Sequence, residues 1–383
     1  MLVIKPFTED LISAVKEFNA RLRSGGAPPE VRFPENVVPR WLPKKQGSGV
    51  FQEIFLAVDD NAVRGGYLIK HQDFAFGDRT LPAGFFRWMV SEGVVDRRFA
   101  WVGVQMLRDA QRTQPLLHGW ATDPLLRILQ LLGWSICPIP FYFKVIRPGH
   151  FFREIQSLRR SWPRELIAQV AARTGLGGVV LGVLQGVRIG RSRTKATAEE
   201  IESFGDWATD LWLKCKGSYA MVGVRDMDTL NTLYAGGKDR FLPYRVVQNG
   251  SVKGWVVLAD NTLSGDKYFG NMRLGWIVDC LAAPEDAALV IQEATHVLQS
   301  RGVDLIVSNQ SHDCWRAAQR AAGFLRGPSN LRFAASPELA KLLQPFPAMM
   351  GRVHYNRGDG EGPFALESKQ AAHELLGTSS KSS

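Results

Sequence analysis

The chain has 383 residues, 45% of them apolar and 22% charged, with a formal net charge of +10. These values describe an ordinary soluble, globular protein, and the length exceeds what one hydrophobic core usually supports, so we expect two domains. The opening residues Met1–Pro6 contain no basic stretch, long apolar run or small-residue cleavage site, which argues against secretion. The four cysteines have no metal-ligand spacing, which argues against a disulfide framework or a zinc site and favours a cytosolic protein.

The predicted elements of the first part of the chain follow an order typical of a mixed sheet. In chain order we expect a strand at 2–6, a helix at 8–23, strands at 52–58, 63–76 and 82–95, a helix at 101–112, a strand at 115–121, a helix at 124–132 and a strand pair at 134–146. The second part repeats this order, with helices near 198–214 and 226–234, strands at 242–248, 252–260 and 270–281, a helix at 285–300, a strand at 303–308, a helix at 312–322 and a strand at 324–334. The sequence therefore predicts an α/β (α+β) fold in which a mixed, mostly antiparallel sheet flanked by helices occurs twice.

Two separate motifs repeat at nearly the same offset. Residues Phe55–Ile69 align without a gap on Tyr244–Leu258 at an offset of 189, and both segments read as β-hairpins. Asp123–Trp134 and Asp313–Phe324 each hold a helical stretch that ends in Gly plus an aromatic residue, at an offset of 190. Two motifs at one offset predict two copies of one domain. We expect an N-terminal copy at 1–148, a connector at 149–194, a C-terminal copy at 195–345, and a C-terminal loop and disordered tail at 346–383.

The segment 147–195 carries most of the net charge. It contains ten Lys or Arg residues against two Glu, and its apolar stretch has four glycines at a spacing of four, which form a groove on a helix. One interpretation is a helical connector between the domains. Another is a basic surface that contacts an anionic membrane or a lipid-linked substrate, and a third is a tRNA contact. The apolar run is too short to span a bilayer, so we expect a cytoplasmic protein that can lie against the inner membrane.

In the order of its predicted elements, the chain resembles the GNAT acyltransferase superfamily in both copies. The features that carry the resemblance are the hairpin ending in Val63–Tyr67, the long strand Phe85–Val95 and the helix that closes at Gly133 and Trp134. The resemblance implies an acyl-CoA-dependent N-acyltransferase, with acetyl-CoA or another acyl-CoA as co-substrate and an amine as acceptor. An amino sugar or amino acid in cell-surface polysaccharide assembly is the acceptor that this context suggests. The tandem copies are also similar to FemABX-like aminoacyl transferases, which implies aminoacyl-tRNA as an alternative donor, and a non-catalytic scaffold is a further alternative.

The family binds acyl-CoA at a Gly-containing turn that opens the helix after the long strand, where backbone N–H groups and the helix dipole hold the pyrophosphate. The matching segment here is Arg97–Val104, in which Trp101 replaces the middle glycine. Two solvated arginines at a strand end are the alternative interpretation of this segment. The second copy has no such turn, so we expect the first copy to bind the donor. The cofactor-binding residues that the resemblance implies are Val94, Val95, Arg97, Arg98, Gly103 and Val104.

Catalysis in the family requires a base for the amine and an acid, often a Tyr, for the leaving thiolate. Glu92, at the end of the long strand, is the candidate base, with a solvent-facing strand residue as the alternative. Leu129 and Gln319 occupy the two positions where the Tyr is expected, so Tyr142 is the candidate substitute. These assignments come from the resemblance.

The late stretch 354–363 is denser in polar residues than a structural turn requires. Its glycines permit a tight loop, so Asp359 and Glu361 could contact an amine or a sugar hydroxyl. An exposed turn is the alternative. The tail beyond it has nothing to bury and is predicted to be disordered.

Overall fold

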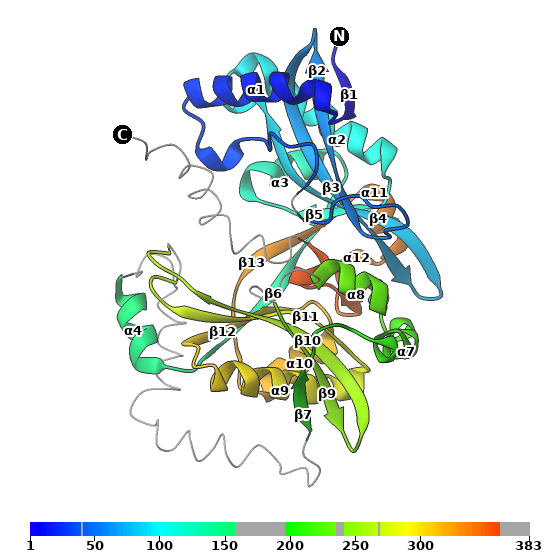
Figure 1. The fold of residues 1–383 in the computed structure, drawn as a ribbon, viewed down its shortest axis with the longest axis vertical. Helices are drawn as coiled ribbons and strands as arrows, with labels where there is room; N and C mark the ends of the chain where they lie inside the picture. Colours follow the sequence, from blue (N-terminus) through cyan, green and yellow to red (C-terminus); the bar gives the residue numbers. More distant parts are fainter. Residues whose placement is uncertain (40, 158–195, 235–240, 267–268, 361–383) are drawn as a thin grey trace.

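The computed structural model describes residues 1–39, 41–157, 196–234, 241–266 and 269–360 (Figure 1). They form one mixed sheet with helices on both faces, which agrees with the predicted fold class. The strand order along the sheet is β1-β2-β3-β4-β5-β13-β6-β12-β11-β10-β9-β7, and β8 and β14 pair off this path. Most of the basic segment 147–195 and all of the tail from Glu361 onwards lie outside the described residues.

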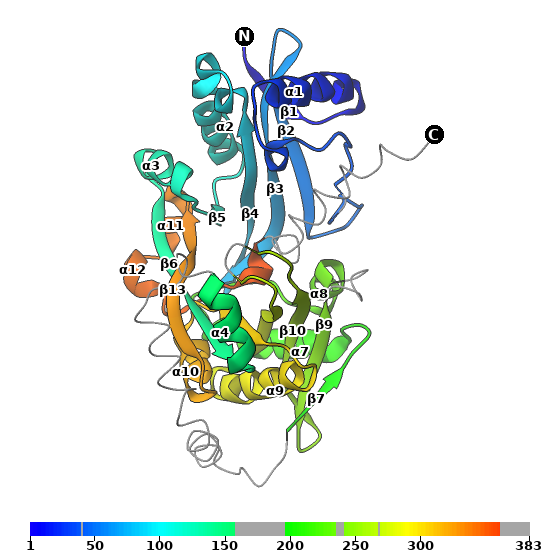
Figure 2. The same cartoon turned by 90° about the vertical axis from the view of Figure 1, so that its left-hand side faces the viewer.

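We call the described residues up to 157 the first half. Its elements are β1 (Val3–Pro6), α1 (Ile12–Ser24), β2 (Phe51–Asp59), β3 (Ala62–Phe76), β4 (Arg79–Ser91), α2 (Ala100–Thr113), β5 (Leu117–Trp120), α3 (Asp123–Leu131), β6 (Ser135–Val145) and α4 (Pro148–Ser157). α1 lies on one face of the sheet and α2 and α3 lie on the other (Figure 2). Val15, Phe18 and Leu22 of α1 are fully buried against β2 and β3, which fixes α1 on its face.

The described residues from 196 to 360 form the second half. Its elements are β7 (Thr197–Glu200), α7 (Asp206–Cys215), β8 (Met221–Gly223), α8 (Met227–Tyr234), β9 (Leu242–Gln248), β10 (Ser251–Thr262), β11 (Arg273–Ala282), α9 (Ala287–Ser300), β12 (Leu305–Asn309), α10 (Asp313–Ala321), β13 (Leu325–Ala335), α11 (Pro337–Leu342), α12 (Phe346–Met349), β14 (Val353–His354) and the 3-10 turn η7 (Arg357–Asp359). The prediction of a helix near 198–214 was wrong for its first residues, because the helix α7 begins only at Asp206. Thr197–Glu200 pairs with β9 instead, so pairing at the sheet edge outweighs helix propensity there.

Both predicted hairpins are confirmed. β2 and β3 turn at Asp60 and Asn61, and β9 and β10 turn at Asn249 and Gly250; all four turn residues have positive φ. Two-residue turns of this kind match the twist of the flanking strands, which is why Asn, Asp and Gly occur there.

Each half contributes one strand to the sheet of the other half: β6 from the first half and β13 from the second. β13 of the second half pairs with β5 of the first, and β6 of the first half pairs with β12 of the second; β6 and β13 also pair with each other. The segment 134–146 was predicted as a strand pair and is one strand, β6. The two halves are therefore joined through continuous backbone pairing.

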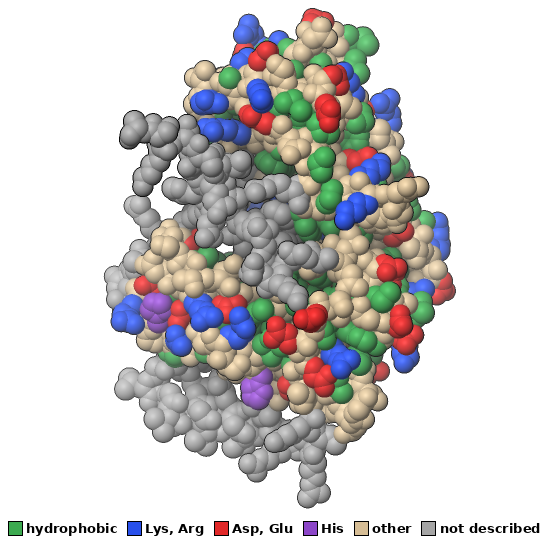
Figure 3. Space-filling model, viewed as in Figure 1, with side chains coloured by type: hydrophobic (Ala, Val, Ile, Leu, Met, Phe, Trp, Pro, Cys, Tyr) green, Lys and Arg blue, Asp and Glu red, His purple; other side chains and the backbone are tan. Residues whose placement is uncertain are grey.

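In the part of the chain that the structure describes, no helix is long and apolar enough to cross a membrane. On the face shown in Figure 3, basic and acidic side chains are interspersed over both halves.

Candidate functional site

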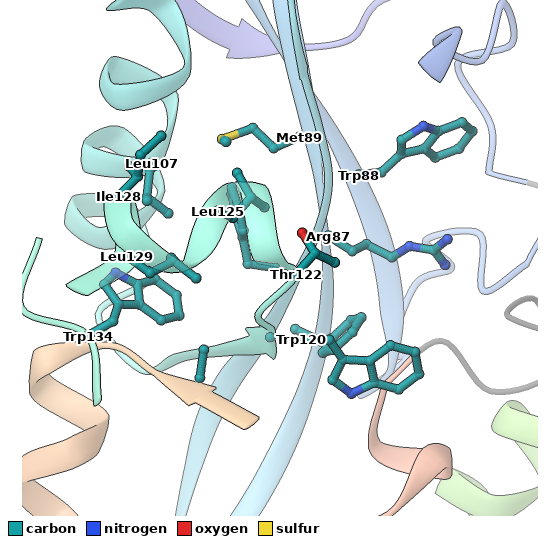
Figure 4. Close-up of a pocket in the computed structure, with 14 residues that line it drawn as sticks. Arg87, Trp88, Met89, Leu107, Trp120, Thr122, Leu125, Ile128, Leu129 and Trp134 are labelled. Carbon is teal, nitrogen blue, oxygen red and sulfur yellow. The ribbon is translucent and has the colours of Figure 1, made fainter. Parts of the chain in front are cut away.

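A cavity of the first half lies where β4 and β5 separate. The two strands pair in parallel from Gly84 and Leu117 to Phe86 and Gly119, and beyond that point they diverge. A cavity of about 220 Å³ opens between them. Figure 4 shows side chains of α2 and α3 on one side of the strands and Arg87, Trp88 and Trp120 on the other. The lining residues are Phe85, Phe86, Arg87, Trp88, Met89, Leu107, Gly119, Trp120, Thr122, Leu125, Ile128, Leu129, Trp134 and Ala334.

A β-bulge in β4 lies on the wall of this cavity. Leu68 of β3 pairs with Arg87 and Gly66 pairs with Val90, so Trp88 and Met89 together face one residue of β3. Trp88 has φ of +51°, a left-handed conformation that is uncommon for a bulky residue. A bulge leaves its extra residue out of the ladder and bends the strand, and bulges are common next to active sites. Strained backbone of this kind concentrates at functional sites, so the bulge marks this cavity as a candidate active site.

The segment predicted to bind acyl-CoA lies beside the cavity. Gly103 is buried in the first turn of α2, where a β-carbon would lie 3.7 Å from the Met89 Cε atom. α2 therefore begins against the bulged part of β4. However, none of the six residues predicted to bind the cofactor is among the described residues that line the cavity. These six are Val94, Val95, Arg97, Arg98, Gly103 and Val104. Val94 is 57% exposed, and Val95 packs against Gly25 at the end of α1.

A carboxylate already caps the turn that precedes α2. Asp96 accepts a hydrogen bond from the Arg98 backbone N–H at 3.0 Å and binds the Arg98 guanidinium at 2.6 Å. Arg98 was expected to be available for phosphate. Asp96 instead pairs with it at the surface and cancels part of its positive charge, which weakens the attraction of this turn for a pyrophosphate. The cavity lining is mostly apolar, whereas this turn carries two guanidinium groups and one carboxylate.

Glu92 is not at the end of the long strand but in a 3-10 turn after it, and it is 4% exposed. Its two carboxylate oxygens accept hydrogen bonds from Arg21 Nε at 2.8 Å and Arg64 Nη1 at 2.9 Å. An acceptor amine would have to displace an arginine to reach this carboxylate. The placement therefore corrects the expected accessible base and indicates a structural ion pair that ties α1 to β3.

Tyr142 belongs to the first half by sequence, like Glu92, but its side chain lies in the core of the second half. It is fully buried in the core of the second half, on β6 between β12 and β13. Its hydroxyl oxygen accepts a hydrogen bond from Arg320 Nη1 at 3.1 Å. The structure therefore does not bring the two predicted catalytic residues together, because the strand exchange carries Tyr142 away from the cavity.

Asp359 belongs to a buried turn and not to an exposed loop. Its carboxylate accepts a hydrogen bond from the Asn356 backbone N–H at 2.8 Å, and Asn356 in turn accepts one from Gly358, which forms a capping box. Arg225 donates to Asp359 at 2.6 Å and to Asp279 at 2.8 Å. Glu361, the other predicted substrate residue, lies outside the described residues.

The turn that contains Asp359 occupies the second half's counterpart of the cavity. β11 and β12 pair in parallel from Leu274 to Ile277 of β11, and the C-terminal segment bridges the residues beyond this point. His354 Nε2 lies 2.7 Å from the Cys280 carbonyl oxygen, and the Asn356 amide donates to Asp279 at 2.9 Å. The second half therefore holds a segment of its own chain at this position.

Lys70 of β3 joins this network from the first half, and no pattern in the sequence indicated it. It is 1% exposed, and its ammonium nitrogen lies 3.2 Å from the Gly358 carbonyl oxygen. Burial lowers the pKa of Lys70 to about 7; the acids Asp359 and Asp279 oppose this shift, and Arg225 and Arg87 add to it. Only the spatial proximity of distant segments creates this group.

The carboxylates of the network have opposite pKa shifts. Burial raises the pKa of Asp359 despite the opposing charge of Arg225. Burial also acts to raise the pKa of Asp279, but the charge of Arg225 and hydrogen bonds from Tyr234 and Asn356 outweigh it, so the pKa is lowered. Burial lowers the pKa of His118, whose Nδ1 lies 3.0 Å from the Tyr355 hydroxyl. These groups form a polar layer between the two halves, next to Trp120 of the cavity wall.

Sequence comparisons find no relative for this chain. No family model matches it, and no curated protein matches it.

Comparison with solved structures shows the fold. The chain is similar to a GCN5-related N-acetyltransferase from Anabaena variabilis ATCC 29413, with a TM-score of 0.51 and 9% identity over 90% of this chain and 75% of that chain. It also aligns with a probable N-acyltransferase of unknown function from Enterococcus faecalis V583 (TM-score 0.49, 11% identity, 91% of this chain and 75% of that chain). A third match is Saccharomyces cerevisiae N-myristoyltransferase with bound myristoyl-CoA (TM-score 0.49, 9% identity, 87% of this chain and 82% of that chain). The first of these similarities supports a GNAT-like fold for the chain.

Proposed function

We propose that this protein transfers an acyl group from acyl-CoA to an amine acceptor, and that the acyl group lies in the cavity between β4 and β5. The observation that carries the proposal is the bulge at Trp88 and Met89 in the wall of an apolar cavity. A thioester needs an apolar site for its acyl chain and a fixed donor for its carbonyl oxygen. The bulge supplies backbone N–H groups that have left the β3–β4 ladder.

In the proposed reaction the acyl thioester lies in the cavity and the acceptor amine approaches its carbonyl carbon. The acceptor amine attacks the thioester carbon, an N–C bond forms, and the C–S bond breaks to release the thiolate. The amine loses one proton and the thiolate gains one, so the exchange is balanced. A backbone N–H at the bulge stabilises the negative charge that develops on the carbonyl oxygen, an effect worth about 3–4 kcal/mol in comparable sites.

The acceptor reaches the reacting carbon from the side opposite α2 and α3. The lining residues on that side are Arg87, Trp88 and Trp120, next to the C-terminal turn of the second half (Figure 4). An amino sugar or amino acid used in cell-surface polysaccharide assembly remains the acceptor that we propose. Acetyl-CoA is the simplest donor, and a cavity of about 220 Å³ also has room for a somewhat longer acyl group.

A second donor is favoured by Asp96. Its carboxylate caps the turn where the pyrophosphate of acyl-CoA was expected. An aminoacyl-tRNA presents an ester without a pyrophosphate, so its binding would not require the full positive charge of Arg98 at this turn. We therefore keep aminoacyl-tRNA as the alternative donor, and the basic segment 147–195 as its proposed contact or as a contact to an anionic membrane.

Isothermal calorimetry with acetyl-CoA, longer acyl-CoAs and tRNA tests the donor. Thr122 is exposed at the cavity, so Thr122→Trp should fold and block it, lowering acyl-CoA affinity at least about tenfold. Leu131→Trp is the matched control, because Leu131 is 78% exposed at the end of α3. Acyl-CoA binding that Thr122→Trp leaves unchanged would place the donor elsewhere, and binding of tRNA alone would favour the alternative.

A further inference from the structure

The cavity between β4 and β5 has an open end and a closed end. Thr122 is exposed and Trp88 is 36% exposed, so these two lining residues mark the open end. Leu107, Leu129 and Trp134 also line the cavity, but they are buried and belong to one apolar cluster. Figure 4 shows these three side chains on the side of α2 and α3. A chain that enters at the open end therefore ends against this cluster.

The closed end presents apolar surface. Ala334 of β13 completes it and is fully buried in the same cluster. Among the side-chain atoms of Leu107, Leu129, Trp134 and Ala334, only the Trp134 Nε1 can form a hydrogen bond, and it has no partner in the described part of the chain. An enclosed apolar cavity stays free of water and binds apolar ligands. The closed end therefore favours a hydrocarbon chain.

The volume of the cavity limits the size of that chain. The cavity measures about 220 Å³. An apolar protein cavity of about 150 Å³ binds benzene, which has six carbon atoms, so the cavity here has room for about six to eight carbons. An acetyl group would leave most of this volume empty, and the lining atoms would lose the dispersion contacts that a longer chain supplies.

The closed end is fixed by the backbone on both of its sides. Gly133, at φ +79°, ends α3, and the Trp134 backbone N–H donates to the Leu129 carbonyl oxygen at 3.0 Å across it. This helix end leaves the position of the Trp134 ring little freedom. Ala334 is paired with Gly119 of β5 and also with β6. Both residues therefore form a rigid stop, and one of them comes from the second half.

We propose that the donor is a medium-chain acyl-CoA, with about six to eight carbons in its acyl group, and that Trp134 and Ala334 set the upper limit of its length. This inference rests on the proposed function, which identifies the cavity as the acyl site. The end of the acyl chain contacts Trp134 and Ala334. The two residues determine specificity and take no part in the chemical step.

Calorimetry on the full-length wild type with acetyl-, butanoyl-, hexanoyl-, octanoyl- and decanoyl-CoA tests the inference. Each buried methylene contributes about 0.8 kcal/mol, or about fourfold in affinity. Affinity should therefore rise to hexanoyl- or octanoyl-CoA, by at least about tenfold over acetyl-CoA, and fall at decanoyl-CoA, which overfills the cavity. A maximum at acetyl- or butanoyl-CoA, or a rise that continues to decanoyl-CoA, would overturn the inference.

Two variants should move the preferred length in opposite directions. Trp134→Leu enlarges the closed end without breaking a hydrogen bond, so the preferred acyl group should become longer. Ala334→Val adds two methyl groups there, so the preferred acyl group should become shorter. Trp207→Leu is the matched control, because Trp207 is half-buried on α7 of the second half, and it should keep the wild-type order.

The melting temperature of each variant shows whether it folds. If Trp134→Leu does not fold, Ala334→Val decides, and if neither folds, the wild-type series decides alone. A folded variant of either residue that keeps the wild-type order would overturn the inference. Equal affinity for all five acyl-CoAs would overturn this inference and leave the proposed function standing, whereas binding of none of them would overturn the proposed donor itself.

Discussion

Gly360 approaches Trp120 so closely that a β-carbon at position 360 would lie 2.6 Å from the Trp120 Cε2 atom. Trp120 belongs to the first half and lines its cavity, whereas Gly360 follows the C-terminal turn of the second half. The shape of the cavity therefore depends on a residue about 240 positions away in the sequence.

We expect Gly360→Ala to push the Trp120 ring into the cavity. Overpacking of this kind typically lowers the free energy of unfolding by about 1–3 kcal/mol, and the displaced ring should also weaken acyl-CoA binding. Urea unfolding and calorimetry measure the two effects. Gly49→Ala is the control, because a β-carbon there meets no atom within 4 Å. Wild-type affinity in Gly360→Ala would contradict a shared wall.

Asp96→Asn should increase the affinity for acyl-CoA. Asparagine caps a helix about as well as aspartate, so the turn should persist while its negative charge is lost. A single charge at a helix start is worth about 0.3–1 kcal/mol, which corresponds to about two- to fivefold in affinity. Calorimetry compares this variant with Asp78→Asn, which changes an exposed turn residue. A decrease in affinity would show that Asp96 does not oppose the donor.

Stability should depend on pH through Lys70. Its pKa is about 7 in the folded protein, against 10.5 for a lysine side chain in water. Between these values the unfolded chain binds one more proton than the folded chain, so the free energy of unfolding rises with pH, by at most about 1.4 kcal/mol per pH unit. The stabilisation is complete above the unfolded pKa and is lost as pH falls to about 7.

Urea unfolding of wild type and Lys70→Met at about pH 7 and about pH 8.5 checks this prediction, because the difference between the two proteins removes the contribution of the other groups, such as the buried thiols, that titrate in this range. Lys70→Met should remove most of the increase in the free energy of unfolding with pH. The variant should therefore exceed wild type in stability by the largest amount at the lower pH. An equal rise in the variant would mean that another group causes the dependence.

Arg225→Leu should destabilise the protein strongly. Arg225 is 1% exposed and binds two buried carboxylates, so its loss leaves two buried charges without their cation. Breaking a buried pair costs about 3–5 kcal/mol. Lys341→Ala breaks an exposed pair with Glu338 and should cost less than about 1 kcal/mol. Similar urea midpoints for the two variants would show that the network contributes little.

The sequence predicted features that depend on local residues. The hairpin turns at Asp60 and Asn61 and at Asn249 and Gly250 use residues that tolerate positive φ, so their pattern is legible in the chain. The strand pairing is also interrupted at matching positions in the two halves. The register shifts at Arg64 and Lys253 are 189 residues apart, and those at Trp88 and Val278 are 190 residues apart. This recurrence supports the proposal of two copies of one domain.

Features that join distant segments could not be predicted in this way. Lys70 and Gly358 are 288 residues apart, and Arg21 and Glu92 are 71 apart, so no local pattern indicated either contact. The position of Tyr142 depends on which half its strand enters, and a strand's own residues do not specify its partner. The cavity lies in the half in which the sequence placed the donor site, and the structure does not bring Glu92 and Tyr142 together there.

The exchange of β6 and β13 determines what each half could do alone. A chain cut between residues 158 and 195 would give two fragments, each of which carries the strand that completes the sheet of the other. Separated, they would expose the edges of β5 and β12, which invite aggregation. Mixed together, they should associate and recover one fold, as in complementation of split proteins. In terms of assembly, the molecule corresponds to an obligate dimer whose two subunits are joined in one polypeptide.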